Sequence, residues 1–452
     1  MKFWGICLLG ILIYDGSCKK VRYDGDQVLK IIPEVTEHVQ YLQKITKEWQ
    51  LDLWKPDLIE EIEAGNEMHV RVPFSYLHQM KENLHQQAMP FTIMITDVQK
   101  LIDHNAQTQH KMQRMSMKSY NYTIYHPMEE IYQWMDDIKD KHSDLVTQHY
   151  LGHTYENRPI YYLKIGWPSH KKKKIFFMDC GIHAREWISV AYCQWFVQEV
   201  LSNHRNDMLL TNVLKQLDFY IVPVFNVDGY VYTWTTERLW RKNRSPHDNG
   251  TCYGVDLNRN FNSRWGTVGI ASECDSPVFC GPSPASEPET QALVSLIETH
   301  KSDILCYINV HSYGQLLLYP YGYSANLSEN HNELEKVAKR AVDLIMEKHN
   351  IEYTEGRTSY LLYSISGASA DWAADLKIKL SYIFELRDDG TYGFELPPDQ
   401  IEPTCQETMT AVMSIIEYIN STYLENSAVT FTSVRLNVIL SCVVCMLYSL
   451  IN

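Results

Sequence analysis

The stretch FFMDCGIHAREWI, residues 176–188, organises the main domain of this chain. Its apolar beginning predicts a buried strand that ends at Gly181, and His183 and Glu186 follow three residues apart. An imidazole and a carboxylate just past a strand end can bind one metal ion when the turn points both inward. The spacing alone is a weak signal, so a metal site needs a third ligand.

The third ligand is expected at another strand end. The apolar residues 306–310 run directly into His311. His183, Glu186 and His311 would form a His₂Glu set that leaves one position open for water. The alternative for His311 is a structural histidine. The HxxE spacing also occurs where a solvated surface pair is the simpler interpretation, at His126/Glu129, His153/Glu156 and His349/Glu352.

A general base is also expected at a strand end. The apolar residues 380–384 lead into Glu385. A carboxylate at the C-terminal end of a central strand faces the crevice in which α/β proteins bind ligands, and it can take a proton from water there. The alternative interpretation is an ion pair between Glu385 and Arg387.

Cations and amides gather in two further segments. Arg238 and Arg241 lie in ERLWRKNR, and Asn258 and Arg259 lie in GVDLNRNF. An arginine beside an amide suits bidentate binding of a carboxylate, and a second arginine near a metal can stabilise an oxyanion. Asp256 can accept a hydrogen bond from a ligating imidazole and fix its tautomer. Taken singly, each arginine is more typical of a surface position.

Composition indicates a globular protein. The 452 residues are 45% hydrophobic and 21% charged, which suffices for one large core and a smaller domain. The formal net charge is -14, and the only basic run is residues 171–174. Nucleic acid is therefore not an expected partner.

Both ends of the chain carry targeting signals. Residues 1–18 predict a signal peptide, with a buried N-terminal helix as the alternative. Residues 425–452 combine small residues, a polar spacer and a short apolar tail, which predicts a GPI-attachment signal. A tail-anchoring helix is the alternative. The expected location is the extracellular face of the plasma membrane through a lipid anchor, or otherwise secretion.

Secretion permits disulfides and N-linked glycans. Among eleven cysteines, the candidate short-range bridges are Cys180–Cys193 and Cys252–Cys274. An odd set remains, so at least one thiol of Cys280, Cys306 and Cys405 is expected to be free. Sequons predict glycosylation at Asn121, Asn249, Asn326 and Asn420, and Asn243 is a fifth sequon in a less suitable place.

Three segments follow the signal peptide. Residues 19–103 show a βαββαβ order, which predicts a small α+β ferredoxin-like unit without a catalytic cluster. Residues 104–120 predict a helical linker in which Lys111, Arg114 and Lys118 suit a trypsin-like protease, with an ordinary interdomain connector as the alternative. Residues 121–424 alternate strands and helices, which predicts an α/β domain with a mixed, mainly parallel central sheet and helices on both faces.

Six motifs in order make the main domain resemble the A/B branch of the zinc metallocarboxypeptidases: HAREW, LWRKNR, DLNRNF, NVHSYGQLLLYPYGY, SISGASADW and FELRDDGTYGF. The first unit resembles the inhibitory prodomain of that family. The resemblance implies one zinc ion bound by His183, Glu186 and His311. It implies that Glu385 is general base and then proton donor, and that Arg241 holds the oxyanion.

The resemblance also implies how a peptide binds. Asn258, Arg259 and Tyr363 would take the terminal carboxylate, and Arg185, Arg238 and Tyr313 would line outer subsites. Ala370 would form the pocket floor, and the aligned lining residues are apolar: Leu318, Leu362, Ile365 and Ile383.

The apolar pocket predicts a preference for hydrophobic C-terminal residues, because a charged side chain would be unpaired there. The alternative is an acidic preference, as in the subtype that the GPI-like tail and the stretches SISGASADW and IEPTCQETM resemble. A catalytically silent binding protein on the same scaffold is a further alternative, as is a zinc aminopeptidase or deacetylase, which the carboxylate clamp disfavours.

Overall fold

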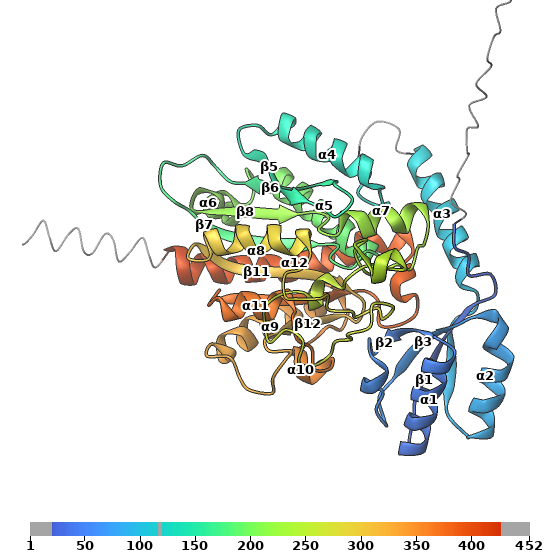
Figure 1. The fold of residues 1–452 in the computed structure, drawn as a ribbon. Coiled ribbons are helices and arrows are strands. Elements are labelled where there is room, and N and C mark those ends of the chain that lie inside the picture. Colours follow the sequence, from blue (N-terminus) through green and yellow to red (C-terminus); the bar gives the residue numbers. More distant parts are fainter. Residues whose placement is uncertain (1–19, 116–119, 426–452) are drawn as a thin grey trace, which may run out of the picture.

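The computed structural model describes residues 20–115 and 120–425 as a small N-terminal unit beside a larger α/β domain (Figure 1). The predicted signal peptide, part of the predicted linker and the predicted anchor signal lie outside these described residues. No helix of the described part combines the length and the apolar character that crossing a bilayer requires.

The N-terminal unit is a four-stranded antiparallel sheet with two helices. Its strands follow the order β2-β3-β1-β4, the order of the predicted ferredoxin-like fold. The apolar sides of both helices close its core, with Leu42 and Met80 fully buried. A long helix, α3, then leads toward the main domain. The elements are β1 (Gln27–Ile31), α1 (Thr36–Glu48), β2 (Asp52–Lys55), β3 (Met68–Val72), α2 (Phe74–Gln86), β4 (Phe91–Ile95) and α3 (Val98–Met115).

The main domain is built on an eight-stranded sheet in the order β13-β12-β14-β11-β7-β8-β6-β5. Its centre is parallel, from β14 through β11 and β7 to β8, whereas β6, β5 and β12 pair antiparallel to their inner neighbours. The predicted mixed, mainly parallel sheet is therefore confirmed. The strands are β5 (Val146–His153), β6 (Pro159–Ile165), β7 (Lys174–Cys180), β8 (Leu217–Val222), β11 (Ile304–Ser312), β12 (Leu316–Tyr319), β13 (Thr354–Arg357) and β14 (Leu380–Leu386).

Helices cover both faces of this sheet (Figure 1). α5 lies against β7 and β11, and α12 packs on both α5 and α9. α11 packs against β14 and β11, close to the centre of the sheet. The helices are α4 (Met128–Lys141), α5 (Trp187–Asn203), α6 (Met208–Gln216), α7 (Val227–Thr235), α8 (Pro288–His300), α9 (His331–His349), α10 (Thr358–Leu361), α11 (Ser369–Asp375) and α12 (Ile401–Ile419).

Three central strands bring the predicted site residues to one edge. β7, β11 and β14 are neighbours and parallel, so their carboxyl ends lie together. In this register His311 is directly opposite Glu385, and His183 follows the end of β7. Every residue of β11 is buried, which explains its continuous apolar run.

The two predicted disulfides are present. Cys180 is bonded to Cys193 and Cys252 to Cys274. The other three cysteines of the described residues, Cys280, Cys306 and Cys405, are free and buried. The prediction of at least one free thiol therefore agrees with the structure.

The sequons differ in accessibility. Asn249 and Asn326 are exposed and Asn121 is half-buried, whereas Asn420 is only 8% exposed. The Asn420 amide donates a hydrogen bond to Glu425, and glycosylation at Asn420 stays a prediction. The fifth sequon, Asn243, is fully buried and donates to Glu287, which agrees with its unfavourable assessment.

Candidate active site

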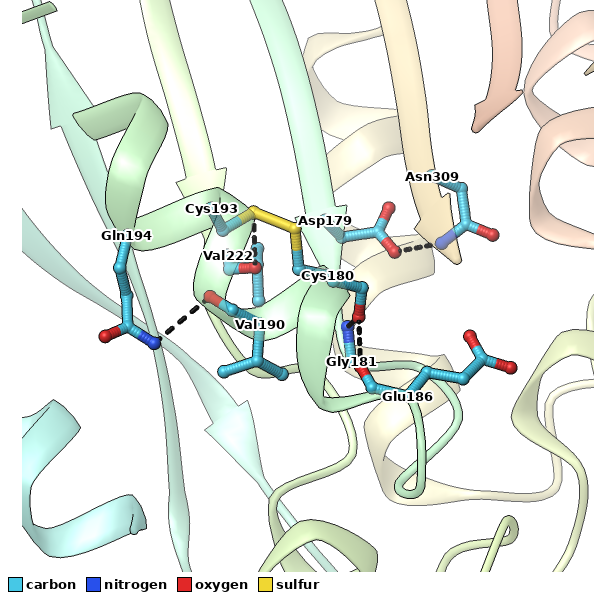
Figure 2. Close-up of a disulfide and its surroundings, with 10 residues drawn as sticks. Asp179, Cys180, Gly181, Glu186, Val190, Cys193, Gln194, Val222 and Asn309 are labelled. Atoms are coloured by element: carbon cyan, nitrogen blue, oxygen red, sulfur yellow. Dashed lines mark hydrogen bonds between the residues drawn. A yellow bond between two sulfur atoms is a disulfide. The ribbon is translucent and has the colours of Figure 1, made fainter. Parts of the chain in front are cut away.

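A sharp turn after β7 aims two side chains at one point. Gly181 has a φ of 67°, a left-handed conformation that favours glycine, and a Cβ there would lie 2.8 Å from Val190. The hydroxyl of Ser189 accepts from the Gly181 amide and donates to the carbonyl of Glu186, which closes the turn (Figure 2). The Cys180–Cys193 disulfide ties the same turn to α5 (Figure 2).

His183, Glu186 and His311 converge as predicted. His183 Nδ1 lies 2.7 Å from one carboxylate oxygen of Glu186, and His311 Nδ1 lies 3.0 Å from the other. The two Nδ1 atoms are 3.1 Å apart, and all three residues are buried. Their ligand atoms lie within 4.8 Å of one another, close enough to bind a single ion.

The donor set fits zinc. His183 Nε2 donates to Asp256 Oδ1 at 3.1 Å, so its Nδ1 carries a lone pair directed toward the carboxylate of Glu186. Buried, converging lone pairs repel one another unless a cation lies between them. Two imidazoles and a carboxylate are the ligands of a catalytic zinc that keeps one position open. The prediction that Asp256 fixes the tautomer agrees with this contact.

Glu385 faces the same cavity as the three candidate ligands. Burial, together with the nearby Glu186 and Asp57 carboxylates, raises the pKa of Glu385 well above its ordinary value. The alternative ion pair with Arg387 does not form. Arg387 instead pairs with Glu407, with its Nε 2.8 Å from Oε1, which leaves Glu385 directed into the cavity.

The predicted carboxylate clamp holds a carboxylate in this structure. It belongs to Asp57 of the N-terminal unit, whose Oδ2 lies 2.9 Å from Arg241 Nη2 and 3.1 Å from Arg259 Nη2. Tyr363 also hydrogen-bonds this carboxylate. Burial raises the pKa of Asp57, but the two guanidinium groups outweigh burial and lower it below the ordinary value. Two members of the predicted clamp, Arg259 and Tyr363, therefore bind this anion together with Arg241, the predicted oxyanion residue.

Asn258 is part of the same wall but is held differently. Its side-chain oxygen accepts from the amide of Ser369 at 2.9 Å, and its backbone amide donates to Asp256 at 2.9 Å. Asp256 also accepts two hydrogen bonds from Arg241, at 2.9 and 3.1 Å. The buried Asp256 carboxylate thus orients the His183 imidazole and the Arg241 guanidinium group. It also accepts from the backbone amide of Asn258.

Two of the predicted outer-subsite residues, Arg185 and Tyr313, contact the N-terminal unit. Arg185 donates to Asp52 at 3.3 Å and stacks on the ring of Phe394 at 3.9 Å. The Tyr313 hydroxyl lies 2.8 Å from Nδ1 of His69. Arg238 forms an ion pair with Glu395 at 2.9 Å and donates to two backbone carbonyls. All these partners of Arg238 belong to the main domain.

The predicted specificity residues form an apolar wall. Leu362, Ile365 and Ile383 line the cavity, whereas Leu318 and Ala370 are buried behind it. Leu318 is directly opposite Ile383 across the β12–β14 pair. The wall contains no cation at these five positions.

Sequence reasoning missed the N-terminal residues that reach the cavity, Trp54, Lys55 and Asp57, and it missed His69, which contacts Tyr313. The other HxxE pairs do not form metal clusters. Within residues 20–115 and 120–425, the one further group with metal-ligating side chains contains Cys252 and Cys274, which form a disulfide.

Comparison with known families agrees with the fold and the site. Residues 131–411 match the zinc carboxypeptidase family, and residues 29–105 match the carboxypeptidase activation peptide. The chain belongs to the zinc carboxypeptidase family. It is a metallocarboxypeptidase with one zinc ion as its cofactor, it acts on peptide C-termini, and its activation peptide implies activation by a protease.

Individual relatives narrow the resemblance. Carboxypeptidase O from Homo sapiens is 53% identical over 330 residues, which are 72% of this chain and 88% of that protein. Carboxypeptidase O from Bos taurus is 55% identical over 307 residues, 68% of this chain and 82% of that protein. The crystal structure of thrombin activatable fibrinolysis inhibitor superposes with a TM-score of 0.83 at 41% identity, over 88% of this chain and 100% of that one. Carboxypeptidase O is the subtype that the sequence resembles.

Proposed function

We propose that this protein is a zymogen-type exopeptidase that removes hydrophobic residues from peptide C-termini. His183, Glu186 and His311 would hold the zinc ion, which would supply Lewis-acid polarisation of the scissile carbonyl and a more acidic water. Glu385 takes the proton of the attacking water and returns it to the leaving amine. Arg241 stabilises the oxyanion that develops on the carbonyl.

The binding of the substrate's terminal carboxylate by Arg259, Tyr363 and Asn258 makes the enzyme an exopeptidase. The observation that carries this proposal is the Asp57 carboxylate, which already occupies the clamp between Arg241 and Arg259. An internal peptide bond offers no such charge, so the guanidinium groups would lose this anionic partner and binding would be weak. Asp57 thus stands in for the C-terminal carboxylate of a substrate.

The test compares two matched peptides with the trypsin-trimmed protein, one ending in a free carboxylate and one in an amide. We expect release of the last residue only from the free acid, and Arg259→Ala should weaken that release without removing zinc. Equal hydrolysis of both peptides would refute the exopeptidase proposal. It would favour an endopeptidase on the same scaffold.

Pocket chemistry supports the hydrophobic preference. Ala370, Ile383, Ile365 and Leu362 offer no partner to a charged side chain, and a buried unpaired charge costs several kcal/mol or more. An acidic preference remains the alternative, because the chain resembles carboxypeptidase O. The rates at which C-terminal Phe and Glu are released from matched peptides distinguish the hydrophobic preference from the acidic one.

The N-terminal unit is proposed to inhibit the enzyme until it is removed. Asp57 covers the clamp, Asp52 covers Arg185, and Trp54 packs 5.0 Å from the ring of Phe394. No peptide can reach Arg259 while Asp57 is in place. Cleavage by a trypsin-like protease in the linker, near Lys111, Arg114 or Lys118, would release the block.

The route to the cell surface is also proposed from sequence. The signal peptide in residues 1–18 and the anchor signal in residues 425–452 place the enzyme on the extracellular face of the plasma membrane through a GPI anchor. The exposed Asn249 and Asn326 support glycosylation during secretion. Release of the protein from cell surfaces by a phosphatidylinositol-specific phospholipase tests the anchor, because a tail-anchoring helix would resist it.

A further inference from the structure

A buried polar pair, Asn309 and Asp179, lies behind His311. Asn309 is two residues earlier on β11, so its side chain is on the same face of the strand as His311. The Asn309 side-chain oxygen lies within hydrogen-bond distance of His311 Nε2. Its side-chain nitrogen donates to Asp179 Oδ1 at 2.5 Å (Figure 2).

The pairing of two strands creates this contact. Asn309 on β11 is directly opposite Asp179 on β7 in the parallel register. Both residues are fully buried, so water cannot replace the bond between them. Asp179 lies near the end of β7, immediately before the turn that leads to Glu186 (Figure 2).

The chemistry of the pair fixes every proton in it. An ionised carboxylate only accepts hydrogen bonds, so the Asn309 amide must present its NH₂ group to Asp179 and its oxygen to His311. Burial raises the pKa of Asp179 to about 6, so this carboxyl is ionised at neutral pH. An oxygen facing His311 Nε2 requires a proton on that nitrogen. Nδ1 then carries the lone pair that faces Glu186.

The side-chain amide of Asn258 does not compete with Asn309 for the ring proton of His311. The side-chain nitrogen of Asn258 lies 3.3 Å from His311 Nε2, and its oxygen is held by the amide of Ser369. A nitrogen that donates cannot accept from a protonated Nε2. Asn309 is therefore the group that accepts the ring proton of His311.

We propose that Asp179 and Asn309 are positioning residues that hold His311 in the tautomer and orientation needed to bind zinc. The inference rests on the proposed zinc role of His311. It adds an asymmetry between the two imidazoles: His183 is oriented directly by the carboxylate of Asp256, whereas a neutral amide separates His311 from its carboxylate. Outer partners of this kind typically change metal affinity by about 10–100-fold when they are removed.

The experiment uses the full chain and four variants. Asn309→Leu removes the acceptor at similar volume, and Asp179→Asn keeps the shape but lets both amides flip. The double variant D179N/N309D exchanges the two groups and places a carboxylate directly on the ring. The side chain of Ile308 is on the other face of β11, so Ile308→Val is the control for packing. Readouts are the zinc dissociation constant by chelator competition, the melting temperature of the apo form and the histidine tautomer by ¹⁵N NMR.

We expect Asn309→Leu to raise the zinc dissociation constant by about 10–100-fold and to give His311 a mixture of tautomers. Asp179→Asn should weaken binding less, and the exchange variant should bind zinc more tightly than Asp179→Asn. Ile308→Val should keep the wild-type zinc affinity and tautomer.

Two results would overturn the inference. One is a folded Asn309→Leu variant with wild-type zinc affinity and a single tautomer. The other applies if that variant does not fold. It is a zinc affinity of Asp179→Asn equal to wild type, or a zinc affinity of the exchange variant D179N/N309D no higher than that of Asp179→Asn. Failure of the wild-type chain to bind zinc would instead refute the proposed function, so the two failures are distinguishable.

Discussion

The carboxylate of Asp57 and the guanidinium group of Arg241 are 2.9 Å apart, although 184 residues separate them in the chain. The contact joins the N-terminal unit to the residue proposed to hold the oxyanion. Because Asp57 also contacts Arg259, one side chain blocks two functions of the site. The proposed inhibitory role of the unit therefore depends on a charge interaction and can be tested by removing one charge.

Asp57→Asn should make the uncleaved chain active. Removal of one partner of a buried ion pair commonly costs about 3–5 kcal/mol, so docking over the clamp should weaken by at least about tenfold. The measurement is hydrolysis of a small C-terminal substrate before and after trypsin. After trypsin, the wild-type and Asp57→Asn enzymes should have the same activity, because Asp57 leaves with the N-terminal unit. Glu60→Gln, an exposed acid nearby, is the matched control, and an uncleaved Asp57→Asn chain as silent as wild type would contradict the account.

Acid should loosen the N-terminal unit through His69. Burial, with Lys55 and Lys30, lowers the pKa of His69 from 6.5 to about 4, although Glu67 opposes this shift. The ring stacks on Tyr313 and lies against Gly390, so it is buried by docking. A released unit takes up the proton more readily. Lys55 and Lys30 belong to the N-terminal unit and still lower the pKa after release, so only the burial by the main domain is lost. Docking therefore weakens as the pH falls through the interval between 6.5 and 4, by at most roughly tenfold per pH unit.

The measurement is the affinity of the cleaved unit for the trimmed enzyme between pH 4 and 7.5. His69→Gln keeps a hydrogen-bonding side chain beside Tyr313 and removes the titration, so its profile should be flatter. The Asp57 carboxyl does not interfere in this window, because its pKa is lowered from 3.8. Parallel pH profiles for wild type and His69→Gln would show that His69 has no such role.

Glu385→Gln should abolish catalysis while preserving the zinc site. Loss of a general base typically lowers the rate by about 10²–10⁴-fold. The amide has nearly the same shape, and Glu385 is outside the His₂Glu set, so zinc content and the binding of a C-terminal product should be unchanged. Steady-state kinetics with metal analysis on the same sample checks both statements. A variant with more than about a tenth of wild-type kcat would exclude Glu385 as the base.

Ala370 should control the preferred C-terminal residue. We expect wild type to release Phe faster than Glu or Lys from matched peptides. Ala370→Arg should shift the preference to Glu and Ala370→Asp to Lys, because each new charge needs a partner of opposite sign. The ratios of kcat/KM should change by about 10²-fold or more, the range of a lost buried polar partner. Faster release of Glu by the wild type would support the acidic alternative.

The sequence predicts the sheet and the site where a local pattern carries the information. Strand ends predict His183, His311 and Glu385, since parallel central strands bring their carboxyl ends to one edge. Edge strands such as β5 and β13 are half exposed and lack a long apolar run, so the sequence marks them less clearly than the central strands.

The contacts of Asp57 and His69 could not be predicted, because they depend on how two folded units pack. Nothing near these residues in the sequence distinguishes them from other surface groups. The Asn309–Asp179 pair could be predicted only in part. The alternation of strand positions places Asn309 on the face of His311, but its partner follows only from the β7–β11 register.

The most direct test is the zinc content of the trypsin-trimmed protein, measured together with release of a C-terminal residue. The account predicts one zinc per chain in the wild type, with zinc and activity both lost in a His183→Ala/His311→Ala variant that still folds. A trimmed, active wild type without stoichiometric zinc would contradict it, as would a double variant that keeps its zinc.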